Sequence, residues 1–399
     1  MNKHRFLPAL LVITLIGTIM ELDMSVPSFP DIAEALDTSG SSVQLTITYN
    51  FFGYCLGALA YGPLSDRYGR RKVMLIGNTI MLLGALGCAV APSIEFLLAS
   101  RLVQGVGAST SVVLVFVIIG DVYRGNQLFK MFGLTNAAMS AFMTAAPALG
   151  GLINRAIGWR GNYATVFAIT LASLLLMMFF LPETKGELEK VSAKKVVGDY
   201  RKLLSSKEFI AASLVPSLLF AAYMVFIAAS SFLYTDTFGL STVEFAGHLL
   251  IVVASFAVAS LLASKVVTLL GGPERTVVCS IAVTVLGIAL FLAFGEGAWA
   301  TTGPIAVFCI GFATVYPVVF GRSMAVFPEL QGAASSLTMS GRALLVTLLT
   351  GIASSLFTGD SIVTAGVMAA AVAVAASLAF LRPKPAPDGV EAEAVAETG

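Results

Sequence analysis

Charged side chains are scarce in this chain. Only 12% of its 399 residues are Asp, Glu, Lys or Arg, about half the share that a soluble domain usually carries, and 57% are hydrophobic. The mean hydropathy of +0.89 indicates an integral membrane protein. The formal net charge of +1 gives no electrostatic reason to expect a nucleic-acid partner.

Residue types that build metal and catalytic sites are also rare. The two histidines, His4 and His248, are poorly placed for a proton relay, and the four cysteines lie in apolar stretches without metal-ligand spacing. No phosphate-binding loop of the Gly-x-x-x-x-Gly-Lys-Ser/Thr type occurs. We therefore expect no metal, no cofactor and no enzymatic activity, and any energy that the protein uses must come from an ion gradient.

Long apolar runs dominate what is present. A membrane-spanning helix needs about 20 mostly apolar residues, and twelve segments meet this criterion: 6–27, 44–63, 73–91, 96–119, 131–153, 162–181, 209–233, 246–270, 276–294, 301–321, 331–357 and 361–381. The fold class is therefore predicted to be an all-α integral membrane protein with twelve transmembrane helices.

One long polar connection, 182–208, divides these helices into two sets of six. We expect an N-terminal six-helix bundle in residues 1–181 and a C-terminal six-helix bundle in residues 209–382. The connection is predicted to be a cytoplasmic linker, and residues 383–399 a disordered cytoplasmic tail.

Cations are distributed unevenly among the predicted loops. If the N-terminus is cytoplasmic and the spans alternate, only Arg155 and Arg160 face the other side, and Arg101 and Arg342 lie within spans. All other Lys and Arg residues then fall in cytoplasmic segments. Because cytoplasmic loops are enriched in these residues, the bias predicts that both termini are cytoplasmic.

A short basic loop joins the second and third predicted spans, with the sequence Gly62-Pro-Leu-Ser-Asp-Arg-Tyr-Gly-Arg-Arg-Lys72. Its cations anchor it in the cytoplasm, because their translocation is costly. An anchor requires neither an acid nor a glycine, so Asp66 and Gly62 indicate an additional role. The pattern resembles the signature loop between the second and third helices of the major facilitator superfamily of secondary transporters.

Further motifs resemble the twelve-helix drug–proton antiporters of the bicyclomycin- and chloramphenicol-resistance type. They are Leu22-Asp-Met-Ser-Val-Pro-Ser-Phe-Pro30, Arg101-Leu-Val-Gln-Gly-Val-Gly107 and Ala146-Pro-Ala-Leu-Gly-Gly151. Two departures stand out. Phe142 and Ala146 replace glycines that are usual in the fifth helix, and Arg342 stands where relatives often carry a neutral amide.

The resemblance implies the major facilitator fold and proton-coupled efflux of small, largely apolar compounds by alternating access. It implies a multidrug antiporter of the bacterial inner membrane that contributes to antibiotic resistance. We expect a monomer in the lipid bilayer whose partners are protons and a small-molecule substrate. An alternative is export of an endogenous metabolite, such as a siderophore or an acidic amino-acid derivative, and Arg342 keeps this alternative open.

Glu21 and Asp23 are the candidate proton carriers. A carboxylate within the hydrocarbon region costs roughly 3 kcal/mol or more and usually faces a cavity or a partner. Residues two apart do not share a helix face, so we expect the two acids to point in different directions.

Arg101 lies about 9 Å inside the fourth span. An ion pair between Arg101 and Asp23 is therefore feasible, and the alternative is an arginine that reaches the headgroups.

Arg342 lies near the middle of the eleventh predicted span, where it needs an acid, a substrate anion or water. We expect it to line the cavity and to contact either Glu21 or an acidic group of the substrate. Aromatic and amide side chains are predicted to complete the wall. The full predicted cavity set is Glu21, Tyr49, Asn50, Tyr54, Tyr223, Phe226 and Arg342.

Two further sets follow from the resemblance. The conformational gate is predicted to comprise Gly62, Asp66, Arg67, Gly69, Arg70, Asp121 and Arg124, with Asp66 contacting the start of the eleventh helix and either Arg70 or Arg124. Close helix packing is predicted at Gly105, Gly107, Pro147, Gly150 and Gly151, because small residues let helices approach and proline permits a bend.

Overall fold

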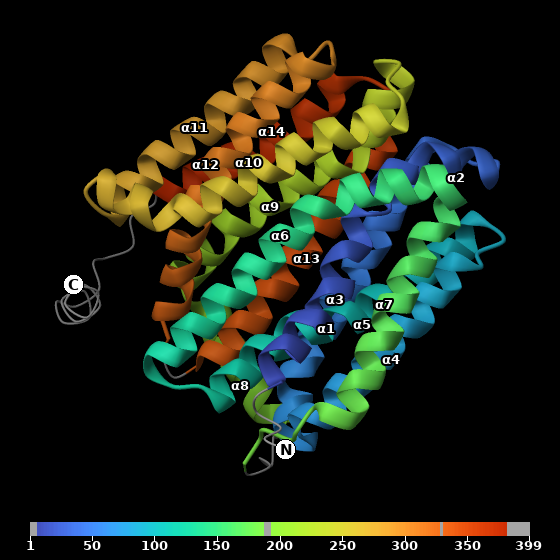
Figure 1. Ribbon diagram of the computed structural model, residues 1–399. Helices are drawn as coiled ribbons and strands as arrows, with labels where there is room; N and C mark the ends of the chain where they lie inside the picture. Colours follow the sequence, from blue (N-terminus) through green and yellow to red (C-terminus); the bar gives the residue numbers. More distant parts are fainter. Residues whose placement is uncertain (1–5, 187–192, 328–329, 381–399) are drawn as a thin grey trace.

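The computed structural model describes residues 6–186, 193–327 and 330–380, and all regular structure in these ranges is helical. Twelve helices of 17 or more residues correspond to the twelve predicted segments (Figure 1). They are α1 (Leu7–Asp23), α3 (Gly40–Tyr68), α4 (Arg70–Ala89), α5 (Ile94–Val122), α6 (Gly125–Ile157), α7 (Trp159–Phe180), α9 (Lys207–Phe232), α10 (Thr242–Leu269), α11 (Pro273–Phe294), α12 (Ala298–Ala325), α13 (Gln331–Leu356) and α14 (Ser361–Phe380).

Ten candidate membrane spans are long and apolar enough to cross a bilayer. The other two long helices, α3 and α6, contain 29 and 33 residues and fall outside that set. Several helices extend beyond the predicted limits. The second predicted segment, 44–63, becomes α3 from Gly40 to Tyr68, because Pro63 is accommodated inside the helix.

Short elements interrupt the predicted plan at three places. The first segment was expected to reach residue 27, but α1 ends at Asp23 and is followed by a 3-10 turn, Val26–Ser28, and by α2, Phe29–Ala35. Pro27 and Pro30 each occupy the first turn of one of these elements, where a missing N–H is tolerated. The linker contains α8 (Ala193–Ser205), and α9 continues into a π-helical turn, Leu233–Thr237.

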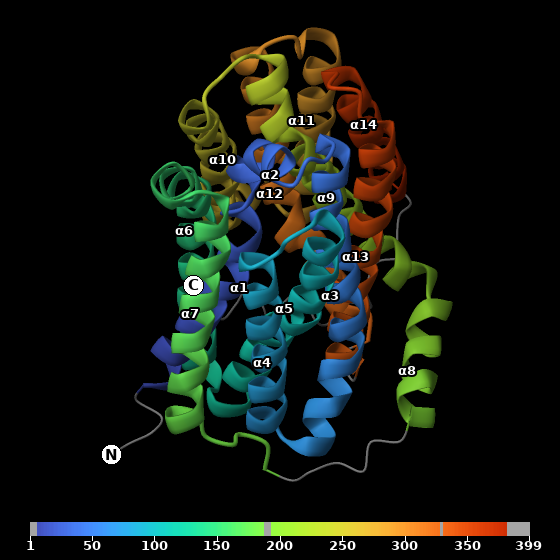
Figure 2. The same cartoon turned by 90° about the vertical axis from the view of Figure 1, so that its right-hand side faces the viewer.

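The long helices pack as two groups (Figures 1 and 2). In the N-terminal group, α5 packs between α3 and α4, and α1 packs against α6 and α7. In the C-terminal group, α12 contacts α9, α10 and α11, while α9 also contacts α13 and α14. The groups meet where α3 packs along α13 and α6 along α10. The largest cluster of buried apolar side chains draws on both groups.

The two ends of the molecule differ in charge and in contacts. We call the end with the turn at Gly69 the basic end, and the end with residues 24–39 the distal end. At the distal end the 3-10 turn contacts α9 and α10, and α2 contacts α9. Elements of the two groups therefore touch each other there.

Candidate proton and substrate site

A buried ion pair joins α1 to α5. Nη1 of Arg101 lies 3.4 Å from Oε2 of Glu21, and their side chains are 0% and 4% exposed. The last turn of α1 positions Glu21, and the second turn of α5 positions Arg101. The structure thus pairs Arg101 with Glu21, whereas the sequence had suggested Asp23. Both residues lie inside helices that are apolar enough to cross a membrane.

Two amide side chains frame this pair. Nδ2 of Asn50 donates to Oε1 of Glu21 at 3.2 Å and to the carbonyl of Arg101 at 3.4 Å. Oε1 of Gln104 accepts from Nη1 of Arg101 at 2.7 Å. Asn50 comes from α3, so three helices meet at one carboxylate. Gly105 makes this approach possible, because a Cβ there would overlap the carbonyl of Asn50.

The cluster keeps unused hydrogen-bonding capacity. Nε and Nη2 of Arg101 and Nε2 of Gln104 are buried without a partner among the described residues. The guanidinium lies 5.8 Å from the ring centre of Tyr163, whose hydroxyl is likewise unpaired within the same ranges. Buried polar groups are normally satisfied. The unused donors of Arg101 and Gln104 can therefore still bind a water molecule or another acceptor beside this ion pair.

Asp23 lies apart from the Glu21–Arg101 pair. Its side chain is 4% exposed, and Oδ1 has no hydrogen-bond partner in the described part of the chain. Glu21 is thus paired within its own helix group, whereas the Asp23 carboxylate takes part in none of the described ion pairs.

Arg342 is held by aromatic side chains of the C-terminal group. Its Nη2 donates to the hydroxyl of Tyr316 at 2.7 Å, and its guanidinium lies 5.0 Å from the centre of that ring. The centres of the Phe220 and Phe320 rings lie 5.3 Å and 6.0 Å away. The sequence predicted that Arg342 contacts either Glu21 or an acidic group of the substrate. The ion pair with Glu21 is not formed, because the Glu21 carboxylate pairs with Arg101.

Tyr54 lies one turn after Asn50 on α3, and its ring centre lies 6.1 Å from that of Phe51. The ring of Phe51, one turn earlier on α3, lies 6.0 Å from Phe220. The structure therefore brings Asn50 and Tyr54 to this region, between the Glu21 cluster and Arg342.

Three other predicted cavity residues are placed differently. Tyr49 is 38% exposed on α3, pointing away from the buried cluster. Phe226 is buried edge-on against Phe291 of α11, within the C-terminal group. Tyr223 stacks on Phe256 of α10, within the C-terminal group. The sequence identified these side chains as aromatic but did not reveal the direction in which each one points.

The basic loop forms an ion-pair network within the N-terminal group. Arg70 pairs with Asp66 at 2.8 Å and with Asp121 of α5 at 3.0 Å. Asp66 also pairs with Lys185 at 2.9 Å, just beyond α7. The expected partner Arg70 is thus found, whereas the ion pairs of Asp66 that the structure describes do not involve the start of α13.

Glu183 was not predicted as part of this network. Its two carboxylate oxygens accept the backbone N–H groups of Arg70 and Arg71 at 2.8 and 3.2 Å. These are the first N–H groups of α4, which have no partner within the helix. Gly69 precedes them with φ +93°, and a side chain there would overlap Glu183. In the sequence, the signal that could have identified Glu183 is an acidic residue beside Pro182, directly after the sixth predicted span.

The remaining gate residues have local contacts. Arg124 donates to the carbonyls of Gly120 and Tyr123 instead of pairing with Asp66. Arg67 lies over the ring of Tyr68 at 5.1 Å. Gly62 marks the approach of the two helix groups, since a Cβ there would lie 2.8 Å from Oγ of Ser336 on α13.

Most of the predicted packing glycines lie at tight helix contacts. Gly107 faces Met81 of α4, and Gly150 faces Met24 after α1. Gly151 faces Ala246 of α10 and so lies between the two helix groups. Pro147 is buried inside α6, which continues past it.

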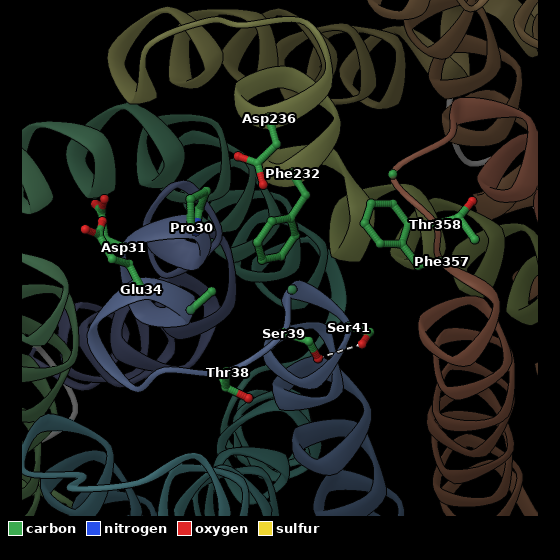
Figure 3. Close-up of a pocket in the computed structure, with 13 residues that line it drawn as sticks. Pro30, Asp31, Glu34, Thr38, Ser39, Ser41, Phe232, Asp236, Phe357 and Thr358 are labelled. Atoms are coloured by element: carbon green, nitrogen blue, oxygen red, sulfur yellow. Dashed lines mark hydrogen bonds between the residues drawn. The ribbon is translucent and has the colours of Figure 1, made fainter.

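A cavity of about 600 Å³ opens at the distal end between the two groups. Figure 3 shows its polar lining, with Asp31, Glu34 and Ser39 on one side and Asp236 and Thr358 on the other. This cavity was not predicted from the sequence, because its lining comes from helix ends and connections that are far apart in the chain.

Comparison with known proteins identifies the family. The model of the Major Facilitator Superfamily matches residues 11–350. This chain belongs to the major facilitator superfamily. It is therefore a membrane transporter, and the resemblance noted in the basic loop is confirmed.

Several curated relatives of this transporter are named for drug resistance. A bicyclomycin resistance protein homolog of Haemophilus influenzae is 28% identical over 335 residues, which cover 80% of this chain and 82% of the relative. Multidrug resistance protein D of Escherichia coli is 27% identical over 346 residues, covering 84% and 86%. The crystal structure of a D-xylose–proton symporter superposes with a TM-score of 0.77 at 15% identity, covering 94% and 97%, and this likeness shows the fold.

Proposed function

We propose that this transporter exports small, largely apolar organic compounds in exchange for protons. The observation that carries the proposal is the buried Glu21–Arg101 pair, which is framed by Asn50 and Gln104 inside the membrane-spanning region. An ionisable pair in such a place is a functional site by default. Its relatives named for bicyclomycin and multidrug resistance support a drug-type substrate.

The pair supplies a proton-dependent contact. When Glu21 is ionised, it holds Arg101 and keeps α1 against α5. Protonation removes the charge of Glu21, so the attraction is lost and Arg101 is free for other partners. Asp23 is a second proton carrier in this proposal, since it is buried and its Oδ1 has no hydrogen-bond partner among the described residues.

The basic end provides the gate. Asp66, Arg70 and Asp121 form one network, and Gly62 meets α13 beside it. We infer that the network holds the basic end of the N-terminal group rigid, while the close contacts at Gly105, Gly107, Gly150 and Gly151 and the helix carrying Pro147 let helices move as units. Alternating access then occurs around the region between Glu21 and Arg342.

We further propose that the protein resides in the bacterial inner membrane with the basic end in the cytoplasm. The cations of the basic loop and the linker support this orientation. Residues 1–181 and 209–382 are the two moving bundles, joined by the linker 182–208, and the functional unit is a monomer. Residues 383–399, the proposed tail, lie outside the described residues.

Proton movement in proteoliposomes tests the proposal. Protein is reconstituted with an internal pH dye and an imposed pH gradient, and chloramphenicol or bicyclomycin is added. The native protein should move protons when substrate is added, and Glu21→Gln should abolish this signal. Glu95→Gln, which removes an exposed acid from the same helix as Arg101, is the matched control and should retain it. Substrate flux without proton movement in the native protein contradicts the proposed coupling.

A further inference from the structure

Half-buried Arg342 differs in its surroundings from the buried arginines Arg101 and Arg70. Arg101 pairs with Glu21, and Arg70 pairs with two aspartates. Among the described residues, no carboxylate oxygen lies within 4.0 Å of the Arg342 guanidinium. A guanidinium that is partly withdrawn from water is stabilised by an anionic partner, because its desolvation is costly. Within the described part of the chain, the positive charge of Arg342 thus has no counter-ion.

Aromatic rings fix the orientation of this charge. Tyr316 and Phe320 stack with an interplanar angle of 6° and ring centres 5.7 Å apart, and both rings lie within 6.0 Å of the guanidinium. Phe220 adds a third ring from α9 at 5.3 Å. Cation–π contacts of this kind hold an arginine in place without neutralising its charge. The aromatic side chains also provide an apolar surface beside a positive group.

The hydrogen bonds of Arg342 are incomplete. Nη2 donates to Tyr316, whereas Nε is buried and has no acceptor in the described part of the chain. Nε and one Nη of an arginine form the fork that binds a carboxylate with two parallel hydrogen bonds. A buried donor without a partner carries an energetic penalty, which an incoming acceptor removes.

We propose that Arg342 binds the carboxylate of an organic anion, and that Phe220, Tyr316 and Phe320 contact the apolar body of that same molecule. This inference rests on the proposed export function and narrows its substrate class to apolar or aromatic carboxylates. Phe220 contacts both Arg342 and Phe51, and Phe51 is the neighbour of Asn50 in the Glu21 cluster, so the substrate occupies the region adjacent to the proton carrier.

The competing explanation is an internal counter-ion. Glu21 or Asp23 would then pair with Arg342 when the helix groups rearrange. In the structure Glu21 is engaged by Arg101, and none of the ion pairs among the described residues joins Asp23 to Arg342. Under this explanation Arg342 would stabilise the protein without ligand and would not discriminate between charged and neutral ligands.

Equilibrium binding to the purified full-length protein in detergent separates these explanations. Three matched pairs are used as probes: 2-naphthoate with 2-naphthamide, benzoate with benzamide, and chloramphenicol succinate with chloramphenicol. The native protein should bind at least one carboxylate roughly tenfold or more tightly than its neutral counterpart, as charge-assisted hydrogen bonds of this kind imply. Arg342→Gln should abolish that preference, and Arg342→Lys should retain part of it, because lysine keeps the charge but lacks the fork.

Arg160→Gln serves as the matched control. Arg160 also lies over an aromatic ring, that of Trp159 at 4.1 Å, but it sits at the distal end, away from the proposed site. This variant should keep the carboxylate preference. Absence of any carboxylate preference in the native protein overturns the proposal, and so does an undiminished preference in Arg342→Gln. If Arg342→Gln unfolds, a preference in Arg342→Lys equal to that of the native protein overturns it.

Failure of this inference is distinguishable from failure of the export proposal. Binding is measured at equilibrium without a gradient, so it does not depend on proton coupling. Glu21→Gln should lose proton movement in proteoliposomes and still prefer carboxylates in detergent. A protein that moves protons with neutral compounds but shows no Arg342-dependent preference keeps its proposed function and loses the proposed substrate class.

Discussion

At the scale of single residues, we expect a single substitution in the Glu21–Arg101 pair to destabilise the protein and a second substitution to restore stability. Arg101→Gln leaves the Glu21 carboxylate buried with Asn50 as its remaining side-chain partner, and breaking a buried pair costs about 3–5 kcal/mol. We expect a marked fall in the melting temperature of the detergent-solubilised protein. Adding Glu21→Gln should recover most of this loss, because both charges are then gone. A double variant that is less stable than Arg101→Gln would show that the two side chains do not act as a pair.

The same residues show how far sequence reasoning reached. Intramembrane charge alone identified Glu21, Asp23, Arg101 and Arg342, because such residues are costly and rarely incidental. The pairing of Arg101 with Glu21 was not predictable. It depends on the rotation of α1 relative to α5, and a helix pattern that is apolar on nearly every face does not define that rotation. The position of the aromatic side chains around Arg342 was not predictable for the same reason.

At the scale of helices, Gly105 determines how closely α3 and α5 pack. A methyl group at this position would overlap the backbone carbonyl of Asn50, and a backbone atom cannot move aside as a flexible side chain can. Gly105→Ala should therefore separate the helices and displace Asn50 from Glu21. We expect a lower melting temperature and weaker substrate-induced proton movement.

Gly247→Ala is the control for that substitution. Gly247 lies on α10, and an added Cβ there has no neighbour within 4 Å among the described residues. Alanine has the higher helix propensity, so this variant should be as stable as the native protein or slightly more stable. Equal effects of the two substitutions would show that close packing at Gly105 is unimportant.

A second prediction at the scale of helices concerns hydrogen–deuterium exchange at the start of α4. Glu183 accepts the N–H groups of Arg70 and Arg71, which have no partner inside the helix. Glu183→Ala should accelerate hydrogen–deuterium exchange in a peptide covering the first turn of α4. Glu296→Ala, which removes an acid at the distal end, should leave exchange there unchanged. An unaltered exchange rate in Glu183→Ala would indicate that water satisfies these groups equally well.

At the scale of the whole molecule, the twelve helices were predictable because the bilayer requires long apolar segments. The arrangement of the two groups relied on resemblance, since sequence periodicity does not state which helices meet between them. The structure supplies those contacts. Oγ1 of Thr48 lies 2.8 Å from Oγ1 of Thr350, and Ser354 donates to Gln44 at 3.3 Å. Both contacts join α3 to α13 near the distal end.

If alternating access opens the distal end, a covalent bond across these contacts must stop transport. A Thr48→Cys/Thr350→Cys pair should form a disulfide on mild oxidation, in a background where exposed Cys279 is replaced by serine. Oxidation should abolish substrate flux in proteoliposomes, and reduction should restore it. Each single cysteine variant should be insensitive to the oxidant. Full flux in the cross-linked protein would mean that α3 and α13 do not separate at this end, and substrate would then need a path between other helices of the two groups.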